Sequence, residues 1–245
     1  MKKRKPMKNV AIYILSFLII TSCTAQQLQQ VQDAVGDYLN EDTPLTSGDV
    51  ASGLKEALVH GITKGSNNAS QLDGYFKNPQ IKIPFPPDAQ NVADKLTAIG
   101  LGGEVDKFVM TLNRGAEAAA KEAKPIFVSA ITSMTIEDAW SILKGEPNSA
   151  TEYLRKSTSD QLTGKFKPVM QNSLNEVNAT KYYGDLVDKY NKIPFVQKAN
   201  PDLDDYATQL AIDGLFTLIA KEEANIRKDP LARTTDLLKK VFANQ

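Results

Sequence analysis

The chain has 245 residues and a formal net charge of zero, from 29 Lys and Arg against 29 Asp and Glu. It contains one histidine and one cysteine, which excludes a multi-histidine metal site and a disulfide within the chain. No glycine-rich phosphate loop or dinucleotide fingerprint is present, so the common nucleotide-binding classes are excluded as well.

Residues 1–22 have the pattern of a secretory signal peptide. A basic start with Lys2 and Lys8 precedes an apolar run over 10–20, and small residues follow directly before Cys23. The run is too short for a membrane span, which needs about 20 residues. Because Cys23 follows the small residues, the segment resembles a bacterial lipobox. We expect lipidation at Cys23, with palmitate among the acyl chains, and attachment to the outer membrane facing the periplasm.

Removal of residues 1–22 changes the charge balance of the chain. The segment carries five cations and no acid, so 24 cations remain against 29 acids, a net charge of −5. Nucleic-acid affinity comes mainly from Lys and Arg on phosphates, and this balance argues against a nucleic-acid partner. It argues equally against electrostatic attachment to anionic lipid. The expected membrane contact is the lipid anchor.

The first elements of the remaining chain are helical. Residues 23–46 predict a lipidated N-terminus, a short amphipathic helix with Leu28 and Val31 on its apolar face, and a linker broken at Pro44. A capped helix is predicted from 47 to about 64, followed by a polar stretch over 65–70. Residues 81–87 predict an extended segment, because a residue before proline is disfavoured in the α region.

From residue 88 onward nearly every segment shows helical spacing of its apolar residues. Helices are predicted over 88–99, 105–123, 126–134, 135–144, 148–154, from 159 to a break at Pro168, and 182–190. The helix from Asp202 to about 228 is apolar nearly all round and is expected to be central and buried. A last helix begins near Thr234. We therefore predict a single all-α domain over 47–245 with about 8–10 helices, and at most a short extended pair at the repeated Lys-Ile-Pro-Phe segments, 82–85 and 192–195.

Several short stretches together resemble a bacterial family known as domain of unknown function 4197. They include residues 54–58, 82–84, 113–117, 134–139, 142–145, 150–153, 213–216, 222–223, 226–230 and 237–242. Gly115 stands where we associate alanine with the family, a departure that matters little at a tight packing contact. The resemblance covers about residues 47–243. It implies a helical, secreted or lipid-anchored protein and no established activity.

Arginine is scarce after residue 22, so arginines on core-forming helices suggest a need for a planar, bidentate group. Arg114 and Glu117 share one helix face, and Glu223 and Arg227 lie four residues apart on the predicted central helix. If these helices pack together, the four residues could form a crossed ion-pair network that clamps them. The alternatives are an anion pocket for a carboxylate or phosphate, using the two arginines, and ordinary exposed pairs.

Asp213 lies in the most apolar stretch of the chain and is a candidate buried polar residue. A buried aspartate needs a partner or a raised pKa, and a hydrogen-bonded structural role is favoured over catalysis or metal binding. Asp202, Asp204 and Asp205 alternate as hard-metal ligands do, but they lack the glycine and distal glutamate of a calcium loop. Helix capping explains them better. We predict no metal site and no cofactor.

Aromatic residues gather around the two Lys-Ile-Pro-Phe segments. Core packing is the default role for such side chains. If both segments meet at one end of the bundle, the rings could instead border an apolar groove for a lipid or a partner segment. The residues concerned are Tyr75, Phe76, Phe85, Tyr182, Tyr183, Tyr190 and Phe195.

These observations favour a non-enzymatic binding or scaffold module in the bacterial cell envelope. Its partners would be an envelope protein, a lipid or a small anionic ligand. The alternative is a carboxylate-based hydrolase or metal enzyme. An enzyme needs at least two acids converging in an open pocket, whereas a scaffold would hold its acids buried against Arg114 and Arg227. The acids in question are Glu117, Asp138, Asp213 and Glu223.

Overall fold

The computed structural model describes residues 45–242, apart from 177, 193, 196–197, 199, 201, 230–231 and 234. The predicted signal peptide, Cys23 and the short helix before residue 40 lie outside the described residues. All the described residues belong to one unit, which begins at Leu45.

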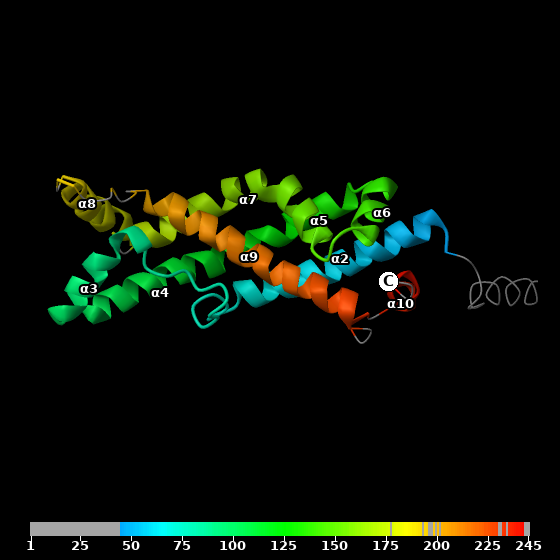
Figure 1. Ribbon diagram of the computed structural model, residues 1–245, viewed down its shortest axis with the longest axis horizontal. Coiled ribbons are helices and arrows are strands. Elements are labelled where there is room, and N and C mark those ends of the chain that lie inside the picture. Colours follow the sequence, from blue (N-terminus) through cyan, green and yellow to red (C-terminus); the bar gives the residue numbers. More distant parts are fainter. Residues whose placement is uncertain are drawn as a thin grey trace, which may run out of the picture. The chain divides into compact units, whose positions relative to one another are not determined.

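All the regular secondary structure of the described part of the chain is helical, without a β-strand, which confirms the all-α prediction. Its elements, in chain order, are α2 (Ser47–Ser70), η1 (Pro87–Ala89), α3 (Gln90–Ala98), α4 (Gly102–Ala119), η2 (Ala120–Glu122), α5 (Ala123–Thr132), α6 (Ile136–Lys144), α7 (Ser149–Glu176), α8 (Ala179–Asn191), α9 (Leu203–Lys228) and α10 (Asp236–Val241) (Figure 1).

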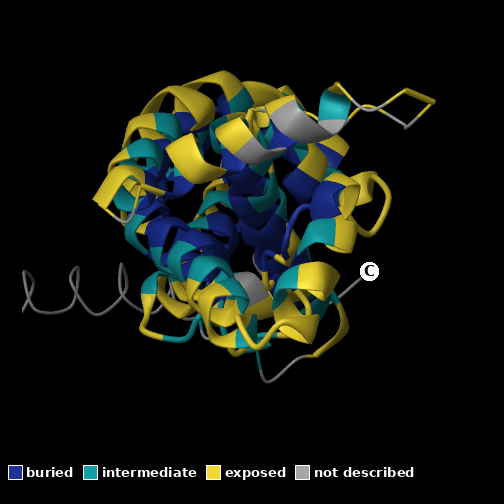
Figure 2. Ribbon diagram, turned by 90° about the vertical axis from the view of Figure 1, so that its left-hand side faces the viewer, coloured by how far each residue is buried: buried dark blue, intermediate teal, exposed yellow. Residues whose placement is uncertain are grey.

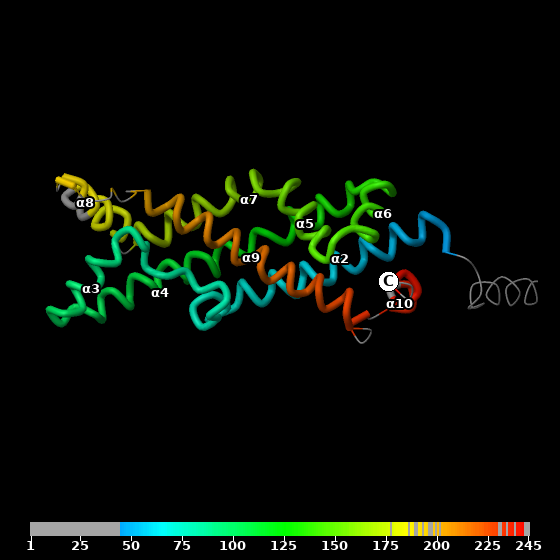
Figure 3. Tube along the Cα trace, viewed as in Figure 1, coloured from blue at the N-terminus to red at the C-terminus, as the bar shows by residue number. Residues whose placement is uncertain are grey.

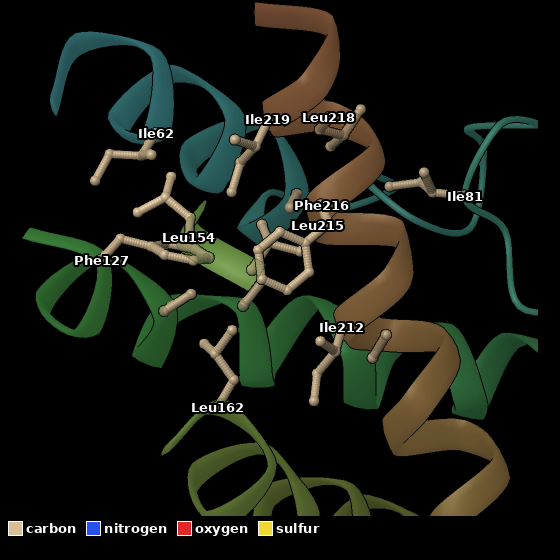
Figure 4. Close-up of a cluster of buried hydrophobic side chains, with 14 of the residues drawn as sticks. Ile62, Ile81, Phe127, Leu154, Leu162, Ile212, Leu215, Phe216, Leu218 and Ile219 are labelled. Carbon is tan, nitrogen blue, oxygen red and sulfur yellow. The ribbon is translucent and has the colours of Figure 1, made fainter. Parts of the chain in front are cut away.

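Helix α9 lies at the centre of this arrangement and packs against α2, α4, α7 and α8. Its buried side chains include Leu215 and Phe216, which point toward residues of α2, α5 and α7 (Figure 4). The rings of Phe216 and Phe127 meet edge to face with centroids 5.6 Å apart. Buried residues fill the interior between the helices, and exposed residues cover the outside (Figure 2). The predicted central helix is therefore confirmed.

Helix α2 is longer than its sequence predicts. The prediction ended the helix near Lys64, but the helix continues through the polar stretch to Ser70. Gly61 and Gly65 lie where α2 approaches α9: a Cβ on Gly65 would come within 3.6 Å of Ile219, and one on Gly61 within 3.4 Å of Ile226. Tertiary packing against α9 thus outweighs the low helix propensity of glycine.

The predicted break at Pro168 is also wrong. Helix α7 runs without interruption over 28 residues, with Pro168 inside it. Pro168 itself is exposed, while Phe166 and Met170 on either side of it are fully buried. Burying these two side chains offsets the roughly 3 kcal/mol that an internal proline costs a helix.

A fixed connection joins α2 to α3 and carries the first Lys-Ile-Pro-Phe segment. Its first turn needs Gly74, because a Cβ there would collide with the carbonyl oxygen of Asn68. Residues 82–84 are extended but pair with a side chain instead of a strand. The Asn113 amide accepts from the Ile83 N–H and donates to the Ile83 carbonyl, both at 2.8 Å. Residue 193 of the second segment lies outside the described residues.

Among the described residues, no single helix has both the length and the apolar character of a membrane span. One bent pair, 102–132 with α6, meets those two criteria jointly and is bent by 106°.

Candidate functional site

Glu223 on α9 is buried, and its carboxylate binds the start of α7. One oxygen accepts from the Ala150 N–H at 3.0 Å, and the other accepts from the Thr151 N–H and hydroxyl at 2.9 and 2.7 Å. A helix N-terminus leaves its first N–H groups unpaired and carries positive partial charge. Glu223 therefore occupies the position that an external anion would take at this helix.

Arg227 pairs with Glu223 and binds the end of the preceding helix. Its guanidinium lies 2.9 Å from the Glu223 carboxylate and donates to the carbonyl of Ile142 at 2.8 Å. A weaker contact at 3.4 Å reaches the carbonyl of Leu143. Both carbonyls belong to the last turn of α6, where backbone oxygens lack partners in the helix. One turn of α9 thus holds the end of α6 and the beginning of α7 together.

Arg114 and Glu117 form a second structural pair, on α4. One guanidinium nitrogen of Arg114 lies 2.6 Å from Glu117, and another lies 2.6 Å from Asp73 in the turn after α2. The second oxygen of Glu117 accepts from the backbone N–H groups of Tyr75 and Phe76, each at 3.2 Å. Asp73 has a φ of +68°, so the turn holds a conformation that non-glycine residues rarely adopt. The pair fastens that turn to α4.

The two pairs do not form the crossed network that the sequence suggested. Tyr75, held by Glu117, donates its hydroxyl to the carbonyl of Ala211 at 2.6 Å, which places the first pair beside that part of α9. Glu223 lies twelve residues further along α9, about 18 Å away at 1.5 Å per residue. The prediction failed because each acid pairs with the arginine on its own helix. The other hydrogen bonds of these acids go to backbone N–H groups and, for Glu223, also to the Thr151 hydroxyl. Neither pair leaves an arginine facing an open anion pocket.

Asp73 gives this turn a dependence on pH. Hydrogen bonds from Lys77 and Arg114 hold its pKa below the ordinary value of 3.8. A lowered pKa contributes stability that is present above pH 4 and is lost as pH falls through the native value. We expect acid unfolding of Asp73→Asn to depend less on pH than that of the wild type between pH 4 and 2. Denaturant midpoints across this range measure the difference, and parallel curves would contradict the assignment.

Asp213 is not buried, which corrects the sequence prediction. Its side chain is 40% exposed and pairs with Arg155 at 2.6 Å. Gln209 donates to its other oxygen at 3.1 Å. Asp213 lies with Gln209 and Thr217 on a narrow polar stripe of α9, spaced four residues apart, that faces solvent. The sequence pattern did not reveal this stripe, because it is narrow and the rest of the helix is almost uniformly apolar.

Of the other acids singled out in the sequence, Asp138 and Asp202 serve helix starts. The side chains of Asp204 and Asp205 instead bind side chains of α7 and α8. Asp138 and Thr135 form a capping box at α6, and hydrogen bonds from Thr135 lower the pKa of Asp138. Asp202 caps α9 by accepting from the N–H of Asp205. Within the residues that the structure describes, no group of three or more His, Cys, Asp or Glu is placed to hold a metal ion.

Helices α3, α4 and α8 lie at the end of the unit away from the start of α2 (Figure 3). An apolar slot is lined by residues of these three helices and of the connection before α3. The slot has a volume of about 240 Å³. Phe85 from the first Lys-Ile-Pro-Phe segment packs on Phe108 with ring centroids 4.9 Å apart, and Phe108 stacks on Tyr183 at 6.3 Å. The lining residues are Phe85, Leu96, Glu104, Val105, Lys107, Phe108, Thr111, Ala179, Tyr182 and Tyr183.

Three of the aromatic residues expected around a groove therefore line this slot: Phe85, Tyr182 and Tyr183. Tyr75 instead lies in the core, Phe76 packs beside Arg114, and the side chain of Tyr190 lies outside the described set. Phe195, in the second repeated segment, is fully exposed. Sequence reasoning missed the α3 and α4 walls, because their apolar residues were assigned to ordinary core stripes. Two exposed residues of the α3–α4 connection, Ile99 and Leu101, could have pointed to this end of the molecule.

The fold and these contacts define an all-α domain with structural ion pairs in its interior and an apolar slot at one end. The chain belongs to the family described as protein of unknown function (DUF4197), whose model matches residues 44–243. The resemblance found in the sequence is thereby confirmed. No curated protein and no solved structure matches the chain.

Proposed function

We propose that this protein is a non-enzymatic binding module of the bacterial cell envelope. It is tethered by lipid at Cys23, faces the periplasm, and takes an apolar ligand or partner segment into the slot between α3, α4 and α8. The single observation that carries the proposal is the slot itself, a hollow walled by aromatic and aliphatic side chains at one end of the unit. Apolar surface left open in this way is typical of a binding site.

The arrangement of the acids supports binding over the carboxylate-enzyme alternative. Hydrolysis by carboxylates requires two of them within reach of one bound atom. Glu117 and Glu223 are instead buried, and both oxygens of each accept hydrogen bonds from the protein. Asp138 and Asp213 are engaged at other positions, in a helix cap and in a pair with Arg155.

The proposed localisation in the cell envelope is supported by the sequence. The basic start, the apolar run over 10–20 and Cys23 directly after small residues support export and lipidation. Buried acyl methylenes contribute about 0.8 kcal/mol each, so a multiply acylated cysteine would give a stable attachment.

The test is an intact-mass measurement under native conditions on the full-length protein, extracted gently from its own envelope. We expect acyl mass on Cys23 and a further noncovalent mass on the order of a few hundred daltons, lost on unfolding. Val105→Trp fills the slot and should remove the noncovalent mass. Thr163→Trp adds the same ring at an exposed site of α7 and should retain it. A wild-type protein without noncovalent mass would contradict slot binding, and an unmodified Cys23 would contradict the anchor.

A further inference from the structure

The mouth of the slot carries one acid and one base. Glu104 and Lys107 both line the slot and are both exposed, which places them at its rim. They lie three residues apart on α4, so their Cβ atoms are neighbours about 5–6 Å apart. Neither has an ion-pair partner among the described residues, in contrast to Arg114, Arg155 and Arg227. The rim therefore presents two unpaired charges of opposite sign, side by side.

The interior of the slot carries no charge. Phe85, Phe108, Leu96 and Val105 supply hydrocarbon, and the Thr111 hydroxyl is occupied by the carbonyl of Lys107 at 3.0 Å. Burial, together with the Asp88 carboxylate, raises the pKa of Tyr183 to about 12, so its phenol stays neutral. A charged group would lose its hydration here without finding a partner, so the part of a ligand that enters must be apolar.

The size of the slot restricts that part to one narrow chain. Sites for drug-sized molecules usually have volumes of roughly 300–1,000 Å³. At about 240 Å³ the slot lies below this range and suits a single alkyl chain better than a pair of chains or a fused ring system.

We propose that the slot binds a single-chain zwitterionic amphiphile of the lysophospholipid class. The alkyl chain lies in the slot against the wall formed by Phe85, Phe108 and Tyr183. The ammonium group of the head faces Glu104, and the phosphate faces Lys107. In an ethanolamine phosphate the two charges are joined by a two-carbon link, a spacing that matches side chains one helical turn apart. This assignment rests on the proposed function and names the ligand class of the same site.

The experiment uses the full-length lipidated protein in phosphatidylglycerol vesicles. The probe is a lysophosphatidylethanolamine with a photoreactive diazirine on a twelve-carbon chain. We expect crosslinks on the peptides of α3, α4 and α8 that line the slot, and none in Val105→Trp. Unlabelled lysophosphatidylethanolamine should displace the probe at concentrations about threefold to fivefold lower than lauric acid or dodecylamine, because each of these offers one charge. Each added chain methylene should strengthen competition about fourfold until the slot is full.

Charge reversals at the rim test the assignment of the head group. Lys107→Glu should weaken lysophosphatidylethanolamine about fivefold or more and make dodecylamine the best competitor. Glu104→Lys should instead favour lauric acid. Both residues are exposed, so neither change should disturb folding, which circular dichroism verifies. Lys165→Glu, at an exposed site of α7, is the control and should leave the order of competitors unchanged.

The possible failures are distinguishable. Slot crosslinks that disappear in Val105→Trp, with an order of competitors that ignores both charge reversals, would overturn the zwitterionic ligand and leave an apolar binding module. An absence of slot crosslinks would overturn the ligand class. If the protein from the native envelope still carried a noncovalent mass that Val105→Trp removes, the proposed binding function would stand, with a ligand of another class. Crosslinks that persist in Val105→Trp would place the probe elsewhere and overturn the assignment.

Discussion

Glu223→Gln is expected to lower the free energy of unfolding by about 3 kcal/mol. The amide keeps the shape of the side chain but removes its charge and replaces one accepting oxygen with a donor. The N–H groups at the start of α7 then lose a charge-assisted acceptor, and Arg227, whose side chain is only 14% exposed, loses its counter-ion. Breaking a buried pair from one side costs roughly 3–5 kcal/mol, and the remaining amide oxygen recovers part of it.

Chemical denaturation measures this loss, and the neighbouring residue provides a matched control. Glu222→Gln makes the same chemical change one position away, where the partner Lys64 is half exposed. Glu222 is itself buried, but the Lys64 ammonium stays in contact with water when its partner is lost, so the change should cost only about 1 kcal/mol. Equal losses in the two variants would show that Glu223 does not fasten α6 to α7.

Asn113→Ala is expected to destabilise the protein by about 3 kcal/mol and to impair the slot. The Asn113 side chain is fully buried and makes three hydrogen bonds, two to Ile83 and one to the carbonyl of Val109. Its removal leaves the buried N–H and C=O of Ile83 without partners, at roughly 1–3 kcal/mol each. Phe85 follows two residues later and forms a wall of the slot, so ligand capture should weaken as well.

Denaturation and crosslinking together check this prediction. Asn175→Ala, at an exposed position of α7, is the control. It should change the free energy of unfolding by no more than about 0.5 kcal/mol and leave the crosslinking yield unchanged within experimental error. A stable Asn113→Ala protein with normal crosslinking would contradict the role assigned to this amide.

The helices could be predicted from the sequence, because apolar periodicity and capping are local patterns. The spacing of Leu215, Phe216 and Ile219 places α9 in the core, and Thr135 with Asp138 marks the start of α6, where the structure has a capping box. These patterns depend on residues within a few positions of one another, so they can be recognised without knowledge of the tertiary contacts.

The remaining features depend on contacts between distant segments. The extension of α2 past Lys64 comes from packing against Ile219, and the continuity of α7 through Pro168 comes from burial of its neighbours. The slot combines walls from α3, α4, α8 and one connection, which no local pattern brings together. Asn113 left one signal: it is a polar residue four positions after Val109, on the stripe that also contains Ala116 and Ala120.

The double grip of α9 on α6 and α7 also determines which changes of chain length the domain tolerates. Residues 145–148 connect the last carbonyls of α6 with the first N–H groups of α7, and a single turn of α9 binds both. Surface connections usually accept insertions at little cost. A deletion differs, because removing one of these four residues would pull one helix end away from Arg227 or the other away from Glu223. Gly145 tightens this constraint, because a Cβ there would collide with the Ser149 hydroxyl. Shortening of the domain should therefore be directed to other connections.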